Sequence, residues 1–338
     1  MRGLAYVVIL NWNGRSYLRD CLRAAFAQTY PDYRVLVVDN GSTDGSADIA
    51  HDEFPEAILL PLERNLHYAR GSNEGMRAAL RDPKCAYVVL LNNDTRADPE
   101  WLAEMVRSVD GRIGMVASKL LFMDRPKVVN SAGIAIARDG SSKDRGWNEP
   151  DDGRFDTAPD VFGASGGAGL YRREVLDEVG LFDEDFVAYY EDVDLAWRAR
   201  LAGWEAHFAP RSIVYHKYSG SIGHASPWRQ YQCERNRVWN LVQNYPWRYV
   251  ATGITWNATR LVASRLPRRP EAGEPAATTE TPRGSVRIHA RARIDAYASL
   301  GRALRKRRQR QPQRRVDAAE VGQWLRRYGV SLHDILSP

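Results

Sequence analysis

Residues 4–14 read LAYVVILNWNG, a run of seven apolar residues that ends in a polar cluster. Such a run, without alternation, predicts a β-strand that is buried on both faces. The same arrangement returns in VLVVDNGS at 35–42 and in YVVLLNND at 87–94. We expect helices between these strands, at 16–28 and 73–80. Repeated β-α units of this kind predict an α/β fold with a Rossmann-like, mostly parallel sheet flanked by helices.

The polar clusters at 11–14, 39–42 and 92–94 each follow a predicted strand. Carboxyl ends of parallel strands meet at one edge of a sheet, and open α/β sheets bind their ligands at that edge. We therefore expect the three clusters to form one binding site. The first strand leads into NWNG and not into the GxGxxG turn of dinucleotide-binding proteins, which argues against a nucleotide-dependent dehydrogenase.

Individual side chains of these clusters have two interpretations each. Asp94 offers a carboxylate to Mg²⁺ or Mn²⁺, which prefer oxygen ligands, but Asn and Asp also favour strand-ending turns. Asp39 can accept a hydrogen bond from a base or a ribose hydroxyl, or it can cap the next helix. Trp12 can stack on a nucleobase, or it can pack against the neighbouring helix.

A second group of ionisable residues lies in the second half of the chain. Glu191, Asp192 and Asp194 begin a predicted helix, where the helix dipole favours acidic side chains. Three carboxylates in four residues repel one another when buried, so a purely structural role is less favourable, and one of them can act as a general base. His216 follows a short predicted strand. A lone histidine is more often structural, and a metal-binding role for it depends on its distance from Asp94.

Five blocks, taken in order along the chain, resemble glycosyltransferase family 2, the inverting enzymes with the GT-A fold. The blocks are VVILNWNG at 7–14, VVDNGSTDGS at 37–46, RN at 64–65 through NEG at 73–75 to LLNND at 90–94, GLFD at 180–183 through YEDVDL at 190–195, and VYH at 214–216. The resemblance covers roughly residues 4–245. Within the family it is greatest for the rhamnosyltransferase-like branch that builds bacterial surface polysaccharides.

The resemblance implies roles for individual positions. It places the family's DXD motif at 92–94, where Asn92 stands in place of the first carboxylate. Binding of Mg²⁺ or Mn²⁺ would then rest on Asp94, with His216 as a second protein ligand, and Asp192 would be the catalytic base. The remaining implied residues would bind the nucleotide (Leu10, Trp12, Asn13, Asp39, Arg64, Asn65, Asn73, Asn92 and Asn93) or face the acceptor and the donor sugar (Ser165, Gly166, Gly167 and Glu191).

The implied reaction moves a sugar from a nucleoside diphosphate to a hydroxyl of a glycan or lipid-linked glycan, with inversion at the anomeric carbon. The branch resemblance favours dTDP-rhamnose as the donor, with UDP- and GDP-sugars as alternatives. The rival interpretations are a non-catalytic nucleotide-sugar-binding protein and, less favoured, a nucleotide-dependent dehydrogenase. Metal-dependent hydrolysis or transfer of a nucleotide sugar distinguishes the enzyme from the binding protein.

Composition indicates how the chain is divided. We expect a GT-A catalytic domain at 1–225 (nucleotide-binding half 1–110, acceptor half 111–225), a helical extension at 226–266, a linker at 267–290 and a basic amphipathic helical tail at 291–338. Beyond position 260 the chain has 17 Lys and Arg against 7 Asp and Glu, a net charge of +10. The rest of the chain therefore carries about −4 of the total of +6.

The tail and the cysteines indicate a location. In the predicted tail helix, arginines such as Arg291 and Arg305 flank an apolar stripe, a pattern typical of helices that bind anionic membrane surfaces. The stripe comprises Ile294, Tyr297, Ala298, Gly301 and Leu304. The cysteines, at 21, 85 and 233, lack disulfide or metal-binding spacing, and no signal peptide or membrane-spanning run is evident. We expect a cytoplasmic protein attached peripherally to the inner face of the cell membrane. Binding of nucleic acid through the tail is the alternative, since arginine-rich helices serve both uses, but we expect no nucleic acid partner.

Overall fold

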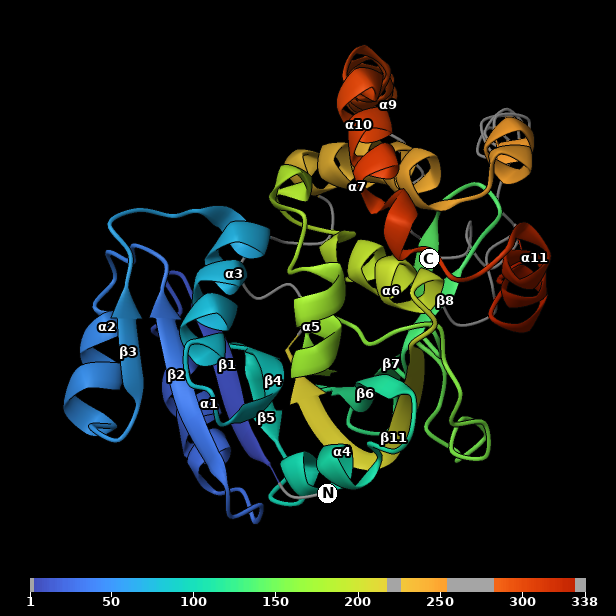
Figure 1. Ribbon diagram of the computed structural model, residues 1–338. Helices are drawn as coiled ribbons and strands as arrows, with labels where there is room; N and C mark the ends of the chain where they lie inside the picture. The colour runs from blue at the N-terminus through green and yellow to red at the C-terminus, as the bar shows by residue number, and fades with distance from the viewer. Residues whose placement is uncertain (1–2, 218–225, 254–282, 332–338) are drawn as a thin grey trace.

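The computed structural model describes residues 3–217, 226–253 and 283–331 (Figure 1). Within them a nine-stranded sheet runs in the order β3-β2-β1-β4-β10-β6-β11-β5, with β7 paired to β6. Its amino-terminal half consists of four parallel strands, β1 (Leu4–Asn11), β2 (Tyr33–Asp39), β3 (Ile58–Pro61) and β4 (Cys85–Asn92). β1, β2 and β4 lie where the long apolar runs predict strands.

The other half of the sheet is mixed. β10 (Ala168–Arg172) runs antiparallel to both β4 and β6 (Ile113–Phe122), whereas β11 (Glu205–His216) runs parallel to β6. The remaining strands are short: β5 (Thr95–Ala97) at the edge, β7 (Val129–Ser131), and the separate pair β8 (Ile134–Ile136) and β9 (Ser142–Asp144). The predicted α/β class is confirmed, and the sheet as a whole is mixed because β10 inserts in the opposite direction.

Helices cover both faces of the sheet (Figure 1). Val7 and Ile9 of β1 pack toward α1 (Leu18–Phe26) and α4 (Trp101–Arg107). Val8 of β1 packs toward the opposite face, which is covered by α3 (His67–Leu80), α5 (Arg173–Val179) and α6 (Glu191–Leu201). Gly75 lets α3 lie close to the sheet, because a Cβ there would be 2.4 Å from Val8 Cγ1. Short turns complete this part: α2 (Ser46–Asp48), the π-helical turn η1 (Ile49–Glu53) and the 3-10 turn η2 (Glu184–Phe186).

The carboxyl-terminal helices pack onto the α3–α6 side of the molecule. They are α7 (Pro227–Asn244), α9 (Arg283–Ala298), α10 (Leu300–Arg310), the 3-10 turn η3 (Gln311–Gln313) and α11 (Ala318–Arg327). α7 contacts α6, α9 and α10, and Figure 1 shows α9 and α10 beside α7. α9 begins at Arg283, inside the stretch 267–290 expected to be a linker, and 267–282 lie outside the described residues. The proposed domain bounds stay predictions.

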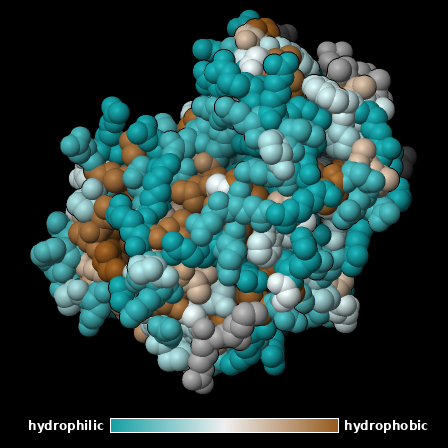
Figure 2. Space-filling model, in the orientation of Figure 1, coloured by the Kyte–Doolittle hydropathy of each residue, from teal (hydrophilic) through white to brown (hydrophobic). Residues whose placement is uncertain are grey.

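The surface is mainly hydrophilic on the face drawn in Figure 2, where apolar residues gather over the β3 edge and between α3 and α5. Among the described residues, no helix combines the length and apolarity needed to cross a bilayer. The three cysteines are free thiols, and none is paired in a disulfide.

Candidate active site at the carboxyl edge of the sheet

The carboxyl ends of β1, β2 and β4 lie side by side, because their register pairs Asn11 with Asp39 and Leu10 with Asn92. Asn11 is fully buried and joins the polar clusters to one another. Its amide nitrogen donates to Ser46 Oγ at 2.8 Å, and its Oδ1 accepts from Asn93 Nδ2 at 2.9 Å. The predicted meeting of the three clusters at one sheet edge is confirmed.

Asp39 presents a buried acceptor at this edge. The residue is only 6% exposed, and its Oδ1 has no hydrogen-bond partner among the described residues. The helix-capping alternative is wrong, because Gly45 stands at the N-cap of α2, which has no side-chain cap. An unsatisfied buried acceptor is costly, so Asp39 Oδ1 is suited to a hydrogen bond from a ligand. Trp12, just beyond β1, is 39% exposed and does not belong to the core.

The loop after β2 gathers further residues of the predicted nucleotide side. Asn13 has a left-handed backbone (φ 50°), and its Oδ1 accepts from Thr43 N at 2.8 Å. Asn65 Oδ1 accepts from Asn40 Nδ2 at 3.0 Å. Arg64 has an exposed side chain, and its backbone lies against Gly41, where a Cβ would be 2.6 Å from Arg64 Cα. Half-buried Leu10 lies under α3 at the same edge.

The hydrogen bonds of Asn73 among the described residues go to the segment before α6 and not to the strand ends. It is 1% exposed, and its amide group donates to Phe182 O at 2.9 Å and to Glu184 Oε1 at 3.0 Å. Its Oδ1 accepts from Phe182 N at 3.0 Å. These contacts attach α3 to the segment before α6, so they are structural, and a nucleotide contact by Asn73 stays a prediction.

Asp94 and His216 face each other across the edge strands. β5 pairs with β11, which places Asp94 Oδ1 3.2 Å from His216 Nε2, with both side chains 9% exposed. His216 Nδ1 lies 2.9 Å from Asn130 Oδ1. In the tautomer with its proton on Nδ1, that nitrogen donates to Asn130 Oδ1, and Nε2 keeps a lone pair toward Asp94. In that tautomer Asp94 Oδ1 and His216 Nε2 both present lone pairs, and two such atoms at 3.2 Å attract each other only with a proton or a cation between them. The carboxylate oxygen of Asp94 and the imidazole nitrogen of His216 therefore suit a divalent metal as ligands. The contact with Asn130 is of the kind that orients metal-binding histidines.

The protein supplies only part of a coordination shell here. No group of three or more His, Cys, Asp or Glu side chains suited to a metal occurs among residues 3–217, 226–253 and 283–331. Mg²⁺ and Mn²⁺ commonly take one or two protein ligands and complete their shells with water and substrate phosphates. The pair therefore fits a metal that binds together with a diphosphate.

The turn at 165–167 connects this pair to the acidic cluster on α6. Gly166 N donates to Asp192 Oδ2 at 2.8 Å, and Gly166 O accepts from the Tyr68 hydroxyl at 2.7 Å. Gly167 O accepts from Asn92 N at 3.0 Å, and a Cβ on Gly167 would lie 3.8 Å from His216 Cε1. The structure thus brings together the DXD position, the histidine, the glycine turn and Asp192.

The loop that leads into α6 has an unusual backbone. Val187, Tyr189 and Tyr190 have φ angles of 67°, 66° and 74°, in the left-handed region that β-branched and aromatic residues rarely occupy. Each such residue costs on the order of 1–3 kcal/mol, and clusters of them occur at functional sites. Asn236 of α7 holds the loop by donating to Phe186 O, Ala188 O and Tyr189 O at 2.7–2.9 Å.

The three carboxylates at the start of α6 differ in their environments. Burial and then the charge of Asp192 raise the pKa of Glu191 well above its usual range. Burial also raises the pKa of Asp192, although hydrogen bonds from Gly166 N and Val193 N oppose this. For Asp194 burial is outweighed by Arg310 and Arg198, which hold its pKa at about 2. Asp194 is therefore a permanently ionised structural group, and Asp192 is the carboxylate that faces the turn at 165–167.

Sequence patterns did not indicate Tyr68, Asn130 or Asp144. Asp144 lies on β9, in the long polar stretch 138–160. Burial raises its pKa to about 6, with a further increase from Asp192 and decreases from hydrogen bonds with Ser131 and Ser165 and from His216. The only sequence signal was the length of that stretch, since long loops in compact domains are often functional.

The fold resembles those of solved glycosyltransferases. The mannosyltransferase PcManGT from Pyrobaculum calidifontis, in complex with GDP-Man and Mn²⁺, superposes with a TM-score of 0.52 at 17% identity, over 88% of this chain and 76% of that one. GalNAc-T7 with UDP, GalNAc and Mn²⁺ superposes with a TM-score of 0.56 at 17% identity, over 80% of this chain and 53% of that one. These likenesses define the class: the GT-A fold predicted from the sequence is confirmed.

Residues 6–180, slightly more than half of the chain, match the family described as "Glycosyl transferase family 2", and the chain belongs to this family. It is 28% identical to the O-antigen biosynthesis protein RfbC of Myxococcus xanthus, over 76% of this chain but only a fifth (20%) of that protein's length. It is 27% identical to the N-acetylglucosaminyl-diphospho-decaprenol L-rhamnosyltransferase of Mycobacterium tuberculosis, over 64% of this chain and 77% of that one. Family membership sets aside the dehydrogenase alternative.

Proposed function

We propose that the chain is a metal-dependent, inverting glycosyltransferase that moves a sugar from a nucleoside diphosphate to a hydroxyl of a glycan or lipid-linked glycan. The observation that carries the proposal is the meeting of the Asp94–His216 pair with Asp192 through the turn at 165–167. A metal-and-diphosphate site next to a carboxylate able to accept a proton is the arrangement that such a transfer needs. Membership of glycosyl transferase family 2 supports the reaction class.

The nucleotide would bind at the ends of β1, β2 and β4. Trp12 supplies an accessible aromatic face for the base, and Asp39 Oδ1 a buried acceptor for a base N–H or a ribose hydroxyl. Asn92 and Asn93, which directly precede Asp94 at the end of β4, would also contact the nucleotide. Our leading donor is dTDP-rhamnose, supported by the rhamnosyltransferase name of the Mycobacterium tuberculosis relative. UDP- and GDP-sugars are the alternatives, and both nucleotides occur in the solved relatives of similar fold.

Asp94 and His216 would hold Mg²⁺ or Mn²⁺. A metal held by these two residues would supply positive charge to the diphosphate leaving group. Asn130 keeps the His216 ring in orientation through its contact with Nδ1. The Mn²⁺ in the two solved glycosyltransferases of similar fold supports this use of the site.

Asp192 would remove the proton from the acceptor hydroxyl. Its Oδ2 is held by Gly166 N at 2.8 Å and its Oδ1 by Val193 N at 2.7 Å, so the carboxylate has one orientation. Burial and then the charge of Asp192 raise the pKa of Glu191 well above its usual range, which favours a protonated side chain that would donate a hydrogen bond beside Asp192. Attack by the deprotonated hydroxyl on the face of the sugar opposite the diphosphate inverts the anomeric carbon. Ser165, Gly166 and Gly167 would border the reacting sugar.

A screen of nucleoside diphosphates tests the binding half of the proposal. We expect dTDP, UDP or GDP to raise the melting temperature of the protein more with Mn²⁺ than with EDTA. The matching sugar nucleotide should then release its nucleoside diphosphate in a metal-dependent reaction. Binding without any release or transfer, with every donor and glycan acceptor tried, would favour the non-catalytic binding protein.

We further propose that the tail attaches the protein to the inner face of the cell membrane through the outer side of α9. Val286, Ile294 and Tyr297 are 62%, 66% and 47% exposed on that helix, and the side chain of Arg291 between them is 81% exposed. Figure 2 shows apolar and hydrophilic residues intermingled at the top, over α9. Exposed apolar residues flanked by arginines suit the interface of an anionic bilayer.

Flotation with liposomes tests the membrane proposal. Binding should require anionic lipid and fall as the salt concentration rises, because exposed charges are screened. Ile294→Glu should abolish flotation. The matched control is Ile58→Glu on β3, at an apolar residue that is 41% exposed, and it should float as the unaltered protein does. Equal binding to neutral vesicles, or no binding to any, would contradict the proposal.

A further inference from the structure

The segment from Asp183 to Asp194 carries the proposed base between two buried carboxylates. It consists of η2, the left-handed residues and the first turn of α6. The side chains of Asp183 and Asp194, at its two ends, are 3% and 0% exposed. Asp192 lies two residues before Asp194 in the same helical turn, so the orientation of Asp194 and that of Asp192 change together.

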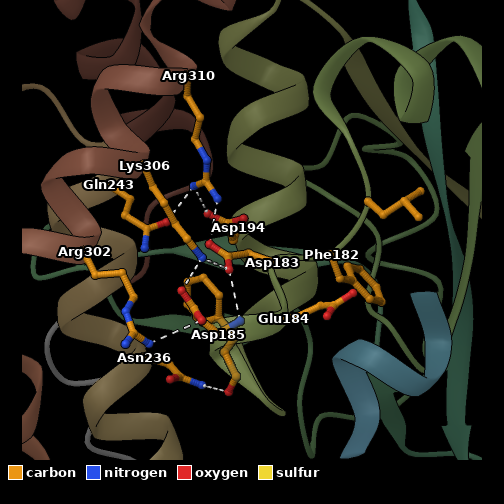
Figure 3. A network of polar contacts seen from close by, with 12 residues as sticks. Phe182, Asp183, Glu184, Asp185, Asp194, Asn236, Gln243, Arg302, Lys306 and Arg310 are labelled. Carbon is orange, nitrogen blue, oxygen red and sulfur yellow. Dashed lines mark hydrogen bonds and ion pairs between the residues drawn. The ribbon is translucent and has the colours of Figure 1, made fainter. Parts of the chain in front are cut away.

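One arginine of the carboxyl-terminal tail binds both ends of this segment (Figure 3). Arg310 Nη1 donates to Asp194 Oδ1 at 2.7 Å, and its Nη2 donates to Asp183 Oδ2 at 2.8 Å. Gln243 Oε1 of α7 accepts from the same Nη1 at 2.6 Å and so fixes the guanidinium plane. Arg310, the last residue of α10, therefore joins the start of this segment to its end.

Neighbouring cations of α10 reinforce the same contact. Lys306 forms ion pairs with Asp183 and Asp185, and Arg302 lies 3.4 Å from Asp185 (Figure 3). Together with Arg310, these two cations contact the acidic segment. Part of the tail's positive charge is thus used inside the molecule, on the element that presents the base.

We propose that Arg310 is a positioning residue for Asp192, an inference that rests on the proposed function. Asp194 also accepts from Arg198 Nε at 2.8 Å and from Asn244 Nδ2 at 2.9 Å. Lys306 pairs with Asp183, but none of these contacts joins the two carboxylates to each other. Without the bridge, the separation of Asp183 and Asp194 is less tightly fixed, so the first turn of α6 can rotate. Rotation would break the bond from Gly166 N to Asp192 Oδ2. A planar guanidinium can serve two carboxylates at defined angles, whereas a lysine ammonium is a single point charge. The residues proposed to bind the nucleotide at the ends of β1, β2 and β4 lie on other elements, so nucleotide affinity should not depend on this bridge.

Steady-state kinetics of the full-length chain tests the inference. We expect Arg310→Gln to lower kcat at least tenfold while the KM for the donor changes less than twofold. Arg310→Lys should recover part of the lost kcat. The matched control is Arg308→Gln, which removes the same charge from an exposed position of the same helix and should behave as the unaltered protein does. Arg310→Gln with an unaltered kcat, or with kcat and donor affinity lost together, would overturn the inference.

A second variant covers the case in which Arg310→Gln does not fold. Asp183→Asn removes the other end of the bridge with little change in size, and it should also lower kcat without raising the donor KM. An unaltered kcat in Asp183→Asn would overturn the inference. Failure of the proposed function is distinguishable from these outcomes, since neither the unaltered chain nor the Arg308→Gln control would then transfer sugar.

Discussion

Replacement of Asp192 by Asn is the perturbation that bears most closely on the proposed chemistry. The side chain keeps its size but loses the charged lone pair that accepts the acceptor's proton. Loss of a general base costs about 10²–10⁴ in rate, which corresponds to about 2.7–5.4 kcal/mol in the activation barrier. We therefore expect kcat to fall within that range.

The structure limits how much of this loss can come from misfolding. Each oxygen of Asp192 accepts one backbone N–H, and an amide has a single oxygen, so the Asp192→Asn variant forfeits one of the two bonds. A hydrogen bond to a charged group contributes about 1.5–3 kcal/mol. Removal of a buried charge offsets part of that cost, because burial raises the pKa of Asp192 and therefore disfavours its ionised form. The net change in the free energy of unfolding should be small.

The assay is release of nucleoside diphosphate as a function of pH, together with nucleotide affinity. Because the pKa of Asp192 is raised, the rate of the unaltered protein should increase with pH, and the midpoint of that increase should lie above the pKa of an ordinary aspartate. Asp192→Asn should lose this acid limb and keep its nucleotide affinity. The matched control Glu191→Gln should be milder, since burial and the charge of Asp192 raise the pKa of Glu191 well above its usual range and so favour the uncharged form that Gln resembles. Near-normal turnover by Asp192→Asn, with an inactive Glu191→Gln, would refute the assignment of the base.

Three further predictions concern the metal, the base pocket and Asp144. Asp94→Ala should abolish turnover and the Mn²⁺-dependent stabilisation by nucleotide measured in thermal melts, with a smaller loss for His216→Ala; full activity in excess EDTA is the contrary result. Trp12→Ala should weaken nucleotide binding about tenfold by calorimetry, because aromatic stacking adds about 0.5–1.5 kcal/mol to area burial; unchanged affinity would exclude stacking. Asp144 has a folded pKa of about 6, above its usual 3.8, so its contribution to stability is present below pH 4 and is lost as the pH rises through 6. Asp144→Asn should therefore stabilise the fold at pH 7.5 by at most about 3 kcal/mol, seen as a higher melting temperature, and change the melting temperature little at pH 4. Equal effects at both pH values would contradict the raised pKa of Asp144.

Much of the amino-terminal half could be predicted from local pattern. Unbroken apolar runs gave β1, β2 and β4, because strands covered by helices on both faces need no polar side chains. The helix predicted to begin with the acidic residues at 191–194 does begin at Glu191. β11 is longer than the short strand predicted before His216. It begins at Glu205, and its first half contains polar residues and a proline, which the apolar pattern of a buried strand does not include. β10 was missed as a strand because it follows a small-residue turn, and its direction depends on partners far away in the sequence.

Site residues could be predicted where they directly follow a strand that the sequence reveals. They could not be predicted where their role depends on contacts with residues far away in the chain. The polar clusters after three strands indicated the ligand edge. The difference between Asp192 and Asp194 depends on Arg310, which is 116 residues from Asp194 along the chain and has no motif of its own. The tail illustrates the same limit: its composition indicated a membrane surface, while the contacts of Lys306 and Arg310 show that part of its charge is used within the fold.

The anomeric configuration of the product tests the central claim most directly. The unaltered chain would be incubated with Mn²⁺, an acceptor glycan and the sugar nucleotide selected by thermal melts, and the product's C1–H1 coupling measured by NMR. We expect a glycoside whose anomeric configuration is opposite to that of the donor, and no glycoside when Asp192→Asn replaces the unaltered chain. A product with the donor's configuration, or one formed equally well by Asp192→Asn, would contradict that claim.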